Sequence, residues 1–213
     1  MDELRRGFHD RLALLHDEVG ALVDVAVLAT ASATTALLEG DARAAQQASS
    51  ARVEGSEAAI EAEVVDLLAL QAPLARDLRF LMASLRIAHE AELSRRLAVA
   101  IAERAGRLDP VVLTERLRPL LYEMGAEASG LLQRASQAYR ALDEGIAASV
   151  IGSEGSARLL HRRFLAEFFA LADTPTESAV ELGVVARCYE RITDHAVEIA
   201  ERVRFVGTPV GGA

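Results

Sequence analysis

Apolar residues recur at spacings of three and four residues along almost the whole chain, and this periodicity predicts helices throughout. The most regular stretch lies near the C-terminus and consists of Val185, Cys188, Ile192, Ala196, Ile199 and Val203. This spacing places all six side chains on one face of a helix, as in a core-facing stripe. No stretch alternates apolar and polar residues convincingly over the length of a strand. The pattern therefore predicts an all-α fold.

Five breaks interrupt this pattern, at Gly40-Asp41, Ala72-Pro73, Leu108-Asp109-Pro110, Asp143-Glu144-Gly145 and Asp173-Thr174-Pro175. The breaks divide the chain into six helices of about 30 residues, each roughly 45 Å long at 1.5 Å per residue. Glycine at positions 40 and 145 predicts left-handed helix ends, and proline at positions 110 and 175 predicts helix starts. Long helices with short connections pack as antiparallel neighbours in a bundle.

Two segments ninety-eight residues apart resemble each other, which indicates an internal repeat. Tyr189–Arg202 reads YERITDHAVEIAER, and Ala91–Arg104 reads AELSRRLAVAIAER. Glu190 aligns with Glu92, whereas Asp194 aligns with Arg96. The repeat predicts two tandem three-helix bundles, residues 1–108 and residues 109–213 with a short C-terminal tail.

The two acidic residues of the second copy stand at the spacing of one helical turn. Glu190 and Asp194 are four residues apart, so their carboxylates share a helix face and repel each other unless something neutralises them. A hard metal ion would do so, because carboxylate oxygens suit such ions. Arg187 and Arg191, each three residues before one of the acids, would do so as well. By spacing alone, a solvated face of ion pairs is favoured over a metal site.

The first copy carries different chemistry at the same place. Glu92 and Arg96 are four residues apart with the acid first, which is the favourable order for a helical ion pair. A repulsive pair has thus become an attractive one, and we expect the first half to have exchanged a carboxylate site for an ion pair.

The remaining candidate residues have ordinary explanations. The single cysteine, Cys188, lies on the apolar stripe and is expected in the core. His195 follows Asp194 but has no serine or cysteine at a motif spacing, so we expect an ordinary surface histidine. No catalytic motif is found, and we expect a protein that is not an enzyme.

The bulk composition excludes several classes of protein. The formal net charge of −9 argues against a nucleic-acid binder, which normally shows a basic patch. The N-terminus is charged from the start, unlike a signal peptide, and no run of about 18 apolar residues is evident that would span a bilayer. We therefore expect a cytoplasmic protein that does not span the membrane.

Three segments together resemble the PhoU family of cytoplasmic accessory regulators of bacterial phosphate uptake and signalling. They are Ala36–Asp41 (ALLEGD), Leu68–Arg79 (LALQAPLARDLR) and Tyr189–Arg202, the last matching the family's Glu-Arg-Ile-Gly-Asp type of helix. The resemblance covers nearly the whole chain in the same six-helix order. It implies a pair of three-helix bundles, usually a homodimer. It also implies a regulator that restrains the phosphate ABC transporter, through its ATPase, and the phosphate-sensing histidine kinase when phosphate is plentiful.

The family's acidic motif, which can hold metal, carries over to the second half of this chain. The motif is intact at Glu190 and Asp194, and Glu154 is a third candidate ligand. The resemblance thus implies a single divalent or ferric ion (Fe, Mn, Mg or Zn) on the second bundle.

The first half departs from the family's motif. Glu92 is kept, but Arg96 stands where the family has aspartate, and the acidic pair of the second helix appears as Ser50 with Glu54. The pair on the fifth helix is reduced in the same way, to Glu154 with Arg158. We therefore expect a degenerate site at Glu92, Arg96 and Glu54, and a divergent member of the family. The alternatives are a metal-binding helical protein with a different partner, or a scaffold whose acidic stripe is only a solvated face.

Overall fold

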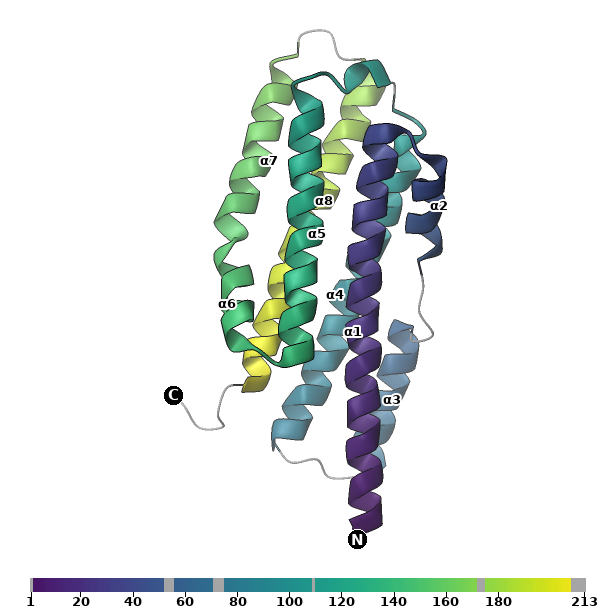
Figure 1. The fold of residues 1–213 in the computed structure, drawn as a ribbon, viewed down its shortest axis with the longest axis vertical. Coiled ribbons are helices and arrows are strands. Elements are labelled where there is room, and N and C mark those ends of the chain that lie inside the picture. Colours follow the sequence, from purple (N-terminus) through teal and green to yellow (C-terminus); the bar gives the residue numbers. More distant parts are fainter. Residues whose placement is uncertain (1, 52–55, 71–74, 109, 172–174, 208–213) are drawn as a thin grey trace.

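A computed structural model of the chain describes residues 2–51, 56–70, 75–108, 110–171 and 175–207, and every regular element in these ranges is a helix (Figure 1). In chain order the elements are α1 (Asp2–Glu39), α2 (Ala42–Ser50), α3 (Glu57–Leu70), α4 (Ala75–Ala105), the 3₁₀ helix η1 (Pro110–Val112), α5 (Leu117–Ala141), α6 (Glu144–Gly152), α7 (Glu154–Phe169) and α8 (Thr176–Gly207). The all-α fold expected from the apolar periodicity is confirmed.

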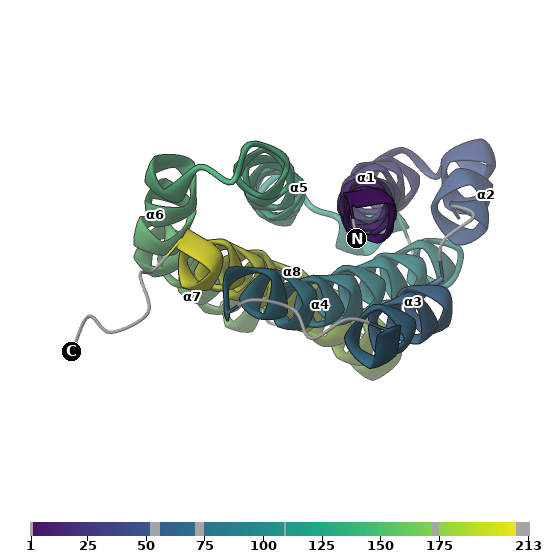
Figure 2. The same cartoon turned by 90° about the horizontal axis from the view of Figure 1, so that it is seen from below.

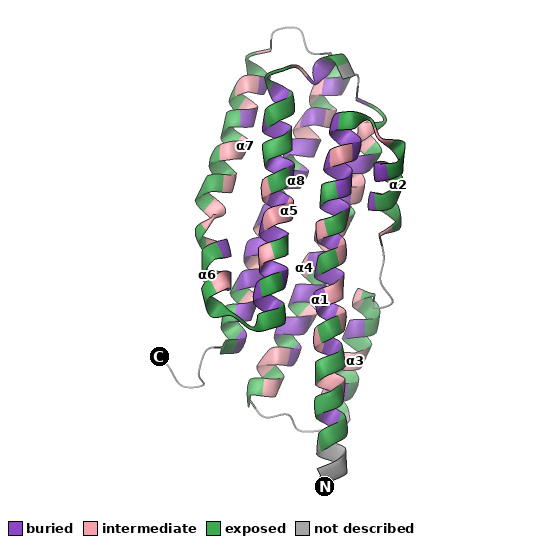
Figure 3. Cartoon of the chain, in the orientation of Figure 1, coloured by how far each residue is buried: buried purple, intermediate pink, exposed green. Residues whose placement is uncertain are grey.

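Four long helices form the centre of the molecule. α1 contacts both α4 and α5, and α8 contacts the same two helices. Seen along the bundle, α1 and α5 lie in one layer, and α4 and α8 lie in the other (Figure 2). The short helices flank this centre, with α2 and α3 beside α1 and α4, and α6 and α7 beside α5 and α8. Buried residues of all four long helices form one continuous core, so the two halves share it (Figure 3).

Two tyrosines cross the core and link its two layers. Tyr139 of α5 is fully buried, and its hydroxyl lies 3.2 Å from the Ser84 hydroxyl of α4. Tyr189 of α8 is equally buried, and its hydroxyl lies 2.9 Å from the Thr34 hydroxyl of α1. Burial raises the pKa of both phenols, so both stay neutral. Each buried hydroxyl therefore has a partner, as a stable core requires.

The repeat is visible in the backbone where the first long helix of each half ends and the next helix begins. Gly40 (φ 68°) and Leu142 (φ 49°) both adopt the left-handed conformation that ends a helix. An aspartate follows each, Asp41 or Asp143, and accepts hydrogen bonds from the first turn of a nine-residue helix. The left-handed end predicted at Gly40 is confirmed. The one predicted at Gly145 is wrong, because the chain turns at Leu142 and Gly145 donates its N–H to the cap Asp143 (2.8 Å).

The second and fifth helices are not continuous, contrary to the prediction of six long helices. α2 ends at an extended residue, Ala51 (ψ 108°), and α3 begins at Glu57. α6 and α7 are separated at Ser153, between Gly152 and Gly155, and glycine is a poor helix former. Each half therefore has an arm of two shorter helices, α2 and α3 or α6 and α7, in place of one long middle helix.

The predicted helix start at Pro110 is also wrong. Pro110 opens the short 3₁₀ helix, and α5 begins only at Leu117, whose N–H donates to the Thr114 hydroxyl (3.3 Å). Pro119 lies in the first turn of α5, where a proline is tolerated, and is the better start signal in this region. Asp109 and Thr174, which precede the two prolines, lie outside the described residues.

α1 corrects one sequence expectation. Between Arg6 and Glu39 it is long and apolar enough to cross a membrane, judged by length and composition alone. Of its most apolar 18-residue window, 61% is buried inside the molecule. Leu15, Val19 and Val23, for example, are completely buried. In this structure the stretch is a core helix.

Candidate functional site

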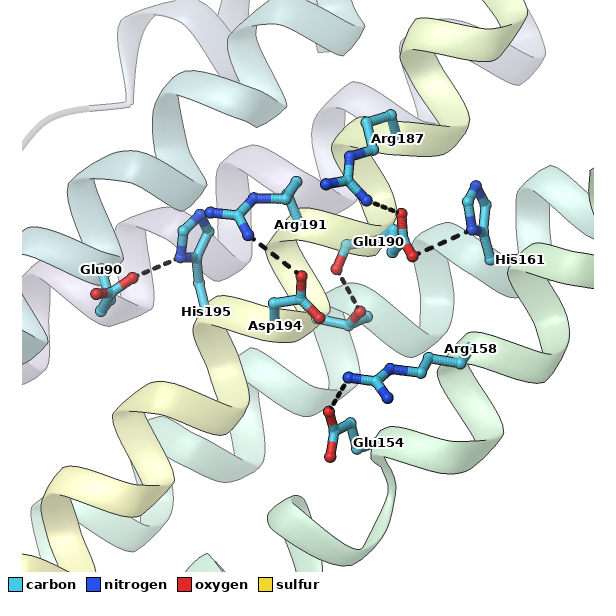
Figure 4. A network of polar contacts seen from close by, with 10 residues as sticks. Glu90, Glu154, Arg158, His161, Arg187, Glu190, Arg191, Asp194 and His195 are labelled. Atoms are coloured by element: carbon cyan, nitrogen blue, oxygen red, sulfur yellow. Dashed lines mark hydrogen bonds and ion pairs between the residues drawn. The ribbon is translucent and has the colours of Figure 1, made fainter.

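Glu190, the first acidic residue of the intact motif, lies where α8 meets α7 (Figure 4). Its side chain is only 19% exposed. One carboxylate oxygen accepts a hydrogen bond from Arg187 one turn earlier. The other lies 3.3 Å from Nδ1 of His161 on α7. Glu190 thus joins two helices, and its partner His161 is indicated by no spacing along the chain, because it lies on a different helix.

The other two predicted ligands have arginine partners of their own. Asp194 lies 3.4 Å from Arg191 Nη1, and Glu154 of α7 pairs with Arg158 (Figure 4). The described part of the chain contains no group of three or more histidine, cysteine, aspartate or glutamate side chains placed to hold a metal ion. The described residues therefore do not fit an ion held by three protein ligands. The arginine partners offered by the spacing are confirmed, whereas a bound metal stays a prediction.

The first-half counterpart is an ion pair, as expected, but a larger one. Glu92 accepts two hydrogen bonds from Arg95 (2.7 and 2.8 Å) and one from Arg96 (2.9 Å). The hydrogen bonds from Arg95 and then Arg96 hold the pKa of Glu92 below its usual value, against the opposing effect of burial. The predicted Glu92–Arg96 pair is confirmed, and Arg95, three residues from Glu92, was overlooked. Glu54 lies outside the described residues.

A small hollow lies beside Glu190, between α5, α7 and α8. It is lined by Met124, Glu127, Ala157, Leu160, His161, Tyr189, Glu190 and Thr193. Its volume, about 10 Å³, is close to what one water molecule needs. Tyr189 lines the hollow with part of its side chain and reaches Thr34 of α1 with its hydroxyl, so the hollow adjoins the centre of the bundle.

His195 is buried, so the expectation of a surface histidine is wrong. It is 4% exposed, and its Nδ1 lies 2.5 Å from a carboxylate oxygen of Glu90 on α4 (Figure 4). A signal for burial was present, because His195 stands three residues after Ile192 and four before Ile199 on the apolar stripe. Its partner could not be found in this way, since Glu90 lies on a different helix.

The Glu90–His195 contact holds the carboxylate in its ionised form. Of the effects on the pKa of Glu90, burial is the largest, and it favours the neutral acid. The hydrogen bond with His195 opposes this effect, and so does the electrostatic attraction from His195, His89 and Arg191. Together they outweigh burial and lower the pKa of Glu90. The contact is therefore an electrostatic link between the two halves of the chain.

A second link joins the same two helices in the same register. Arg104 lies fourteen residues after Glu90 on α4, and Glu181 lies fourteen residues before His195 on α8. Arg104 Nε and Glu181 Oε2 are 2.9 Å apart. Fourteen residues are about four helical turns, so both links lie on the contact face of each helix. Two charged contacts about four turns apart thus join α4 and α8 in antiparallel order.

Cys188 lies in the core, as its place on the apolar stripe predicts. It is 5% exposed, and burial raises the pKa of its thiol. A buried thiol of this kind is unreactive, because the thiolate is the reactive form.

Comparison with known proteins shows the family to which this architecture belongs. The model of the PhoU domain matches residues 20–105 and again residues 121–203. The phosphate-specific transport system accessory protein PhoU homolog 1 of Mycobacterium bovis is 35% identical over 214 residues, covering 97% of this chain and 96% of that protein. PhoU homolog 2 of the same organism is 32% identical, covering 96% of this chain and 98% of that protein.

Solved structures have the same fold. The crystal structure of PhoU from Pseudomonas aeruginosa matches with a TM-score of 0.76 at 24% identity, covering 97% of this chain and 99% of the other. The phosphate transport system regulatory protein PhoU from Streptococcus pneumoniae matches with a TM-score of 0.77 at 20% identity, covering 94% and 97%. At such identities the likeness concerns the fold alone, and the sequence relatives establish the family. The chain belongs to the PhoU family.

Proposed function

We propose that this protein is a non-enzymatic negative regulator of phosphate transport and of phosphate-starvation signalling. The observation that carries the proposal is the match to accessory proteins of the phosphate-specific transport system over almost the full length of both chains. A match of that extent includes both halves of the fold and their shared core, so the proposal concerns the whole chain and not one half of it.

The proposed mode of action is docking. The partners are the ATPase of the phosphate ABC transporter and the phosphate-sensing histidine kinase, both reached from the cytoplasm, with the protein acting as a homodimer. The long helices support this mode, because they form an extended and rigid surface on which another protein can bind. The acidic net charge of −9 further favours protein partners over nucleic acid.

Deletion of the gene tests the regulatory part of the proposal. Without a restraining protein, cells grown with abundant phosphate should take up phosphate faster and express starvation genes. A plasmid copy of the wild-type gene should reverse both effects. Unchanged uptake and unchanged expression in the deletion strain would contradict a negative regulator.

Affinity purification tests the docking part. A tagged chain, expressed at its natural level, should recover the transporter ATPase or the sensor kinase from phosphate-replete cells and less of either from starved cells. Repeated recovery of neither protein would count against the proposed partners. Light scattering on the purified chain gives the molar mass, for which twice the 22.8 kDa of one chain is expected.

A further inference from the structure

α7 is packed less completely than α3, the equivalent helix of the first half. α3 buries Ile60, Val64 and Leu67 with at most 1% exposure. α7 buries only Phe164 and Phe168, whose rings stack with centroids 5.9 Å apart near its C-terminal end. From Glu154 to Arg163 no side chain of α7 is buried (Figure 3). Ala157 and Leu160 pack against the core but stay partly exposed, so the buried anchor of α7 is confined to its last part.

The polar contacts also hold α3 more closely than α7. On α3, Glu63 accepts two hydrogen bonds from Arg11 of α1 (2.7 and 2.8 Å), and Glu57 lies 2.7 Å from His89 of α4. α3 also has one long pair, Arg11–Asp66 at 3.9 Å. The ion pairs that join α7 to other elements are all longer than the Glu63 and Glu57 contacts. They are His161–Glu190 at 3.3 Å, Arg116–Glu167 at 3.6 Å and Arg163–Glu123 at 3.8 Å. The last two are largely exposed, and exposed ion pairs contribute little.

The first two turns of α7 also cover the hollow described above. Ala157, Leu160 and His161 form its α7 side, opposite Met124 of α5 and Tyr189 of α8. A gap of this kind removes the van der Waals contacts that would otherwise hold the segment down. Of the polar contacts here, His161–Glu190 is the one that bridges α7 and α8 (Figure 4).

The N-terminal end of α7 has no side-chain cap. Ser153 occupies the cap position, but its hydroxyl donates back to the Ser149 carbonyl (3.0 Å) and does not accept from α7. Gly152 and Gly155 lie on either side of it, and a Cβ added at either glycine would meet nothing within 4 Å. An uncapped helix end beside two glycines unwinds at low cost.

We propose that Glu154–His161 is a lid that opens by unwinding from the Ser153 end, while the phenylalanine pair stays anchored. The His161–Glu190 contact acts as the catch. Opening uncovers Tyr189, Met124 and the Glu190 carboxylate, which together form an apolar surface with one negative charge. The lid is a property of the fold and does not depend on the proposed partners.

Native-state hydrogen exchange of the intact protein, followed by mass spectrometry or NMR, tests the lid. Amides of residues 157–161 should exchange at least about tenfold faster than those of Ile60–Val64 in α3. Their exchange should also be nearly independent of low denaturant concentrations, as local opening requires. Exchange at the rate of α3, or only through global unfolding, would overturn the proposal.

Two substitutions test the mechanism of opening. Gly155→Ala should slow exchange at 157–161 by about two- to fivefold, because alanine stabilises the helical form. Glu190→Gln should speed it by a similar factor by weakening the catch. The matched control is Gly183→Ala, a glycine in the interior of α8 with open space for a Cβ, which should leave the ratio of α7 to α3 exchange unchanged. If Gly155→Ala and Gly183→Ala behave alike, opening does not start at the uncapped end.

Discussion

Glu92 and Glu190 hold equivalent positions in the two halves, ninety-eight residues apart, and their side chains are similarly buried, at 15% and 19% exposure. Both carboxylates are neutralised, but by different routes. Glu92 is paired with Arg95 and Arg96 of its own helix. Glu190 is paired with Arg187 of its own helix and also with His161 of α7. The repeat has kept the position of the acid and changed what it connects.

The Glu92 cluster is a local interaction within one helix, whereas the Glu190 contact with His161 is a tertiary interaction between two helices. The Glu92 cluster needs only α4, so it forms wherever that helix forms. The Glu190–His161 contact forms only when α7 packs against α8, so the strength of this contact depends on the packing of α7. The two halves therefore differ in whether the pairing of this acid depends on the position of a neighbouring helix.

The largest effect is expected from breaking the link between the helices that carry the two acids. Glu90→Gln removes the charge that His195 faces on α4 and should lower the free energy of unfolding by about 1.5 to 3 kcal/mol at pH 7, the range for hydrogen bonds to charged groups. Because the pKa of Glu90 is lowered in the folded protein, this stabilisation is present above the unfolded pKa of about 4.3 and is lost as pH falls through the folded pKa.

Urea unfolding of wild type and variant at pH 7 and at pH 3 measures this difference. The gap between the two proteins should shrink at pH 3. The control is Glu103→Gln, an exposed glutamate of the same helix, which should change stability little at either pH. An equal gap for Glu90→Gln at both pH values would show that its charge is not the source of the stabilisation.

A second effect concerns the contact beneath Glu190. A Cβ at Gly125 of α5 would collide with the side chain of Thr34, which holds the hydroxyl of Tyr189. Gly125→Ala should therefore lower the free energy of unfolding by about 1 to 2 kcal/mol through overpacking. Gly130→Ala on the same helix is the control, because its Cβ would meet only Arg134 Nη1, at 3.8 Å. Chemical denaturation should show Gly130→Ala to be neutral or stabilising, and equal destabilisation by both would contradict the collision.

A third prediction asks whether arginine partners exclude a metal ion from the second half. Removing them with Arg187→Ala/Arg191→Ala leaves Glu190 and Asp194 as repelling neighbours, which a cation then stabilises. We expect roughly tenfold more Mn or Fe in the double variant than in the wild-type protein, measured by elemental analysis after dialysis. Adding Glu190→Gln to the double variant should abolish the gain. High and equal metal content in all three proteins would place the metal elsewhere.

The smallest effect is expected at the first-half cluster. Arg96→Asp removes one of two arginines from Glu92 and should cost only a few tenths of a kcal/mol, because Arg95 keeps its two hydrogen bonds. Arg95→Ala should cost more than Arg96→Ala, since the Arg95 side chain is 17% exposed and that of Arg96 is 62% exposed. Thermal unfolding of the three variants in one buffer ranks their stabilities. A larger loss for Arg96→Ala than for Arg95→Ala would contradict the stronger role of Arg95.

The sequence by itself determined the features that depend on neighbours along one helix. The apolar period predicted the all-α fold. The glycine at position 40 predicted the left-handed helix end there, and the place of Cys188 on the apolar stripe predicted its burial. The Glu92–Arg96 pair was predictable for the same reason, because a helix sets the distance between residues four apart. Boundaries such as Leu117 were missed, because a cap and a proline mark where a helix can start and not where it must start.

Only the tertiary structure decided which helices meet. It brought His195 to Glu90 across 105 residues and His161 to Glu190. No spacing encodes these contacts, because they depend on how four long helices align and cross. The ninety-eight-residue repeat thus specified two similar halves, and the packing of the helices decided which residues pair with the acid at the equivalent position of each half.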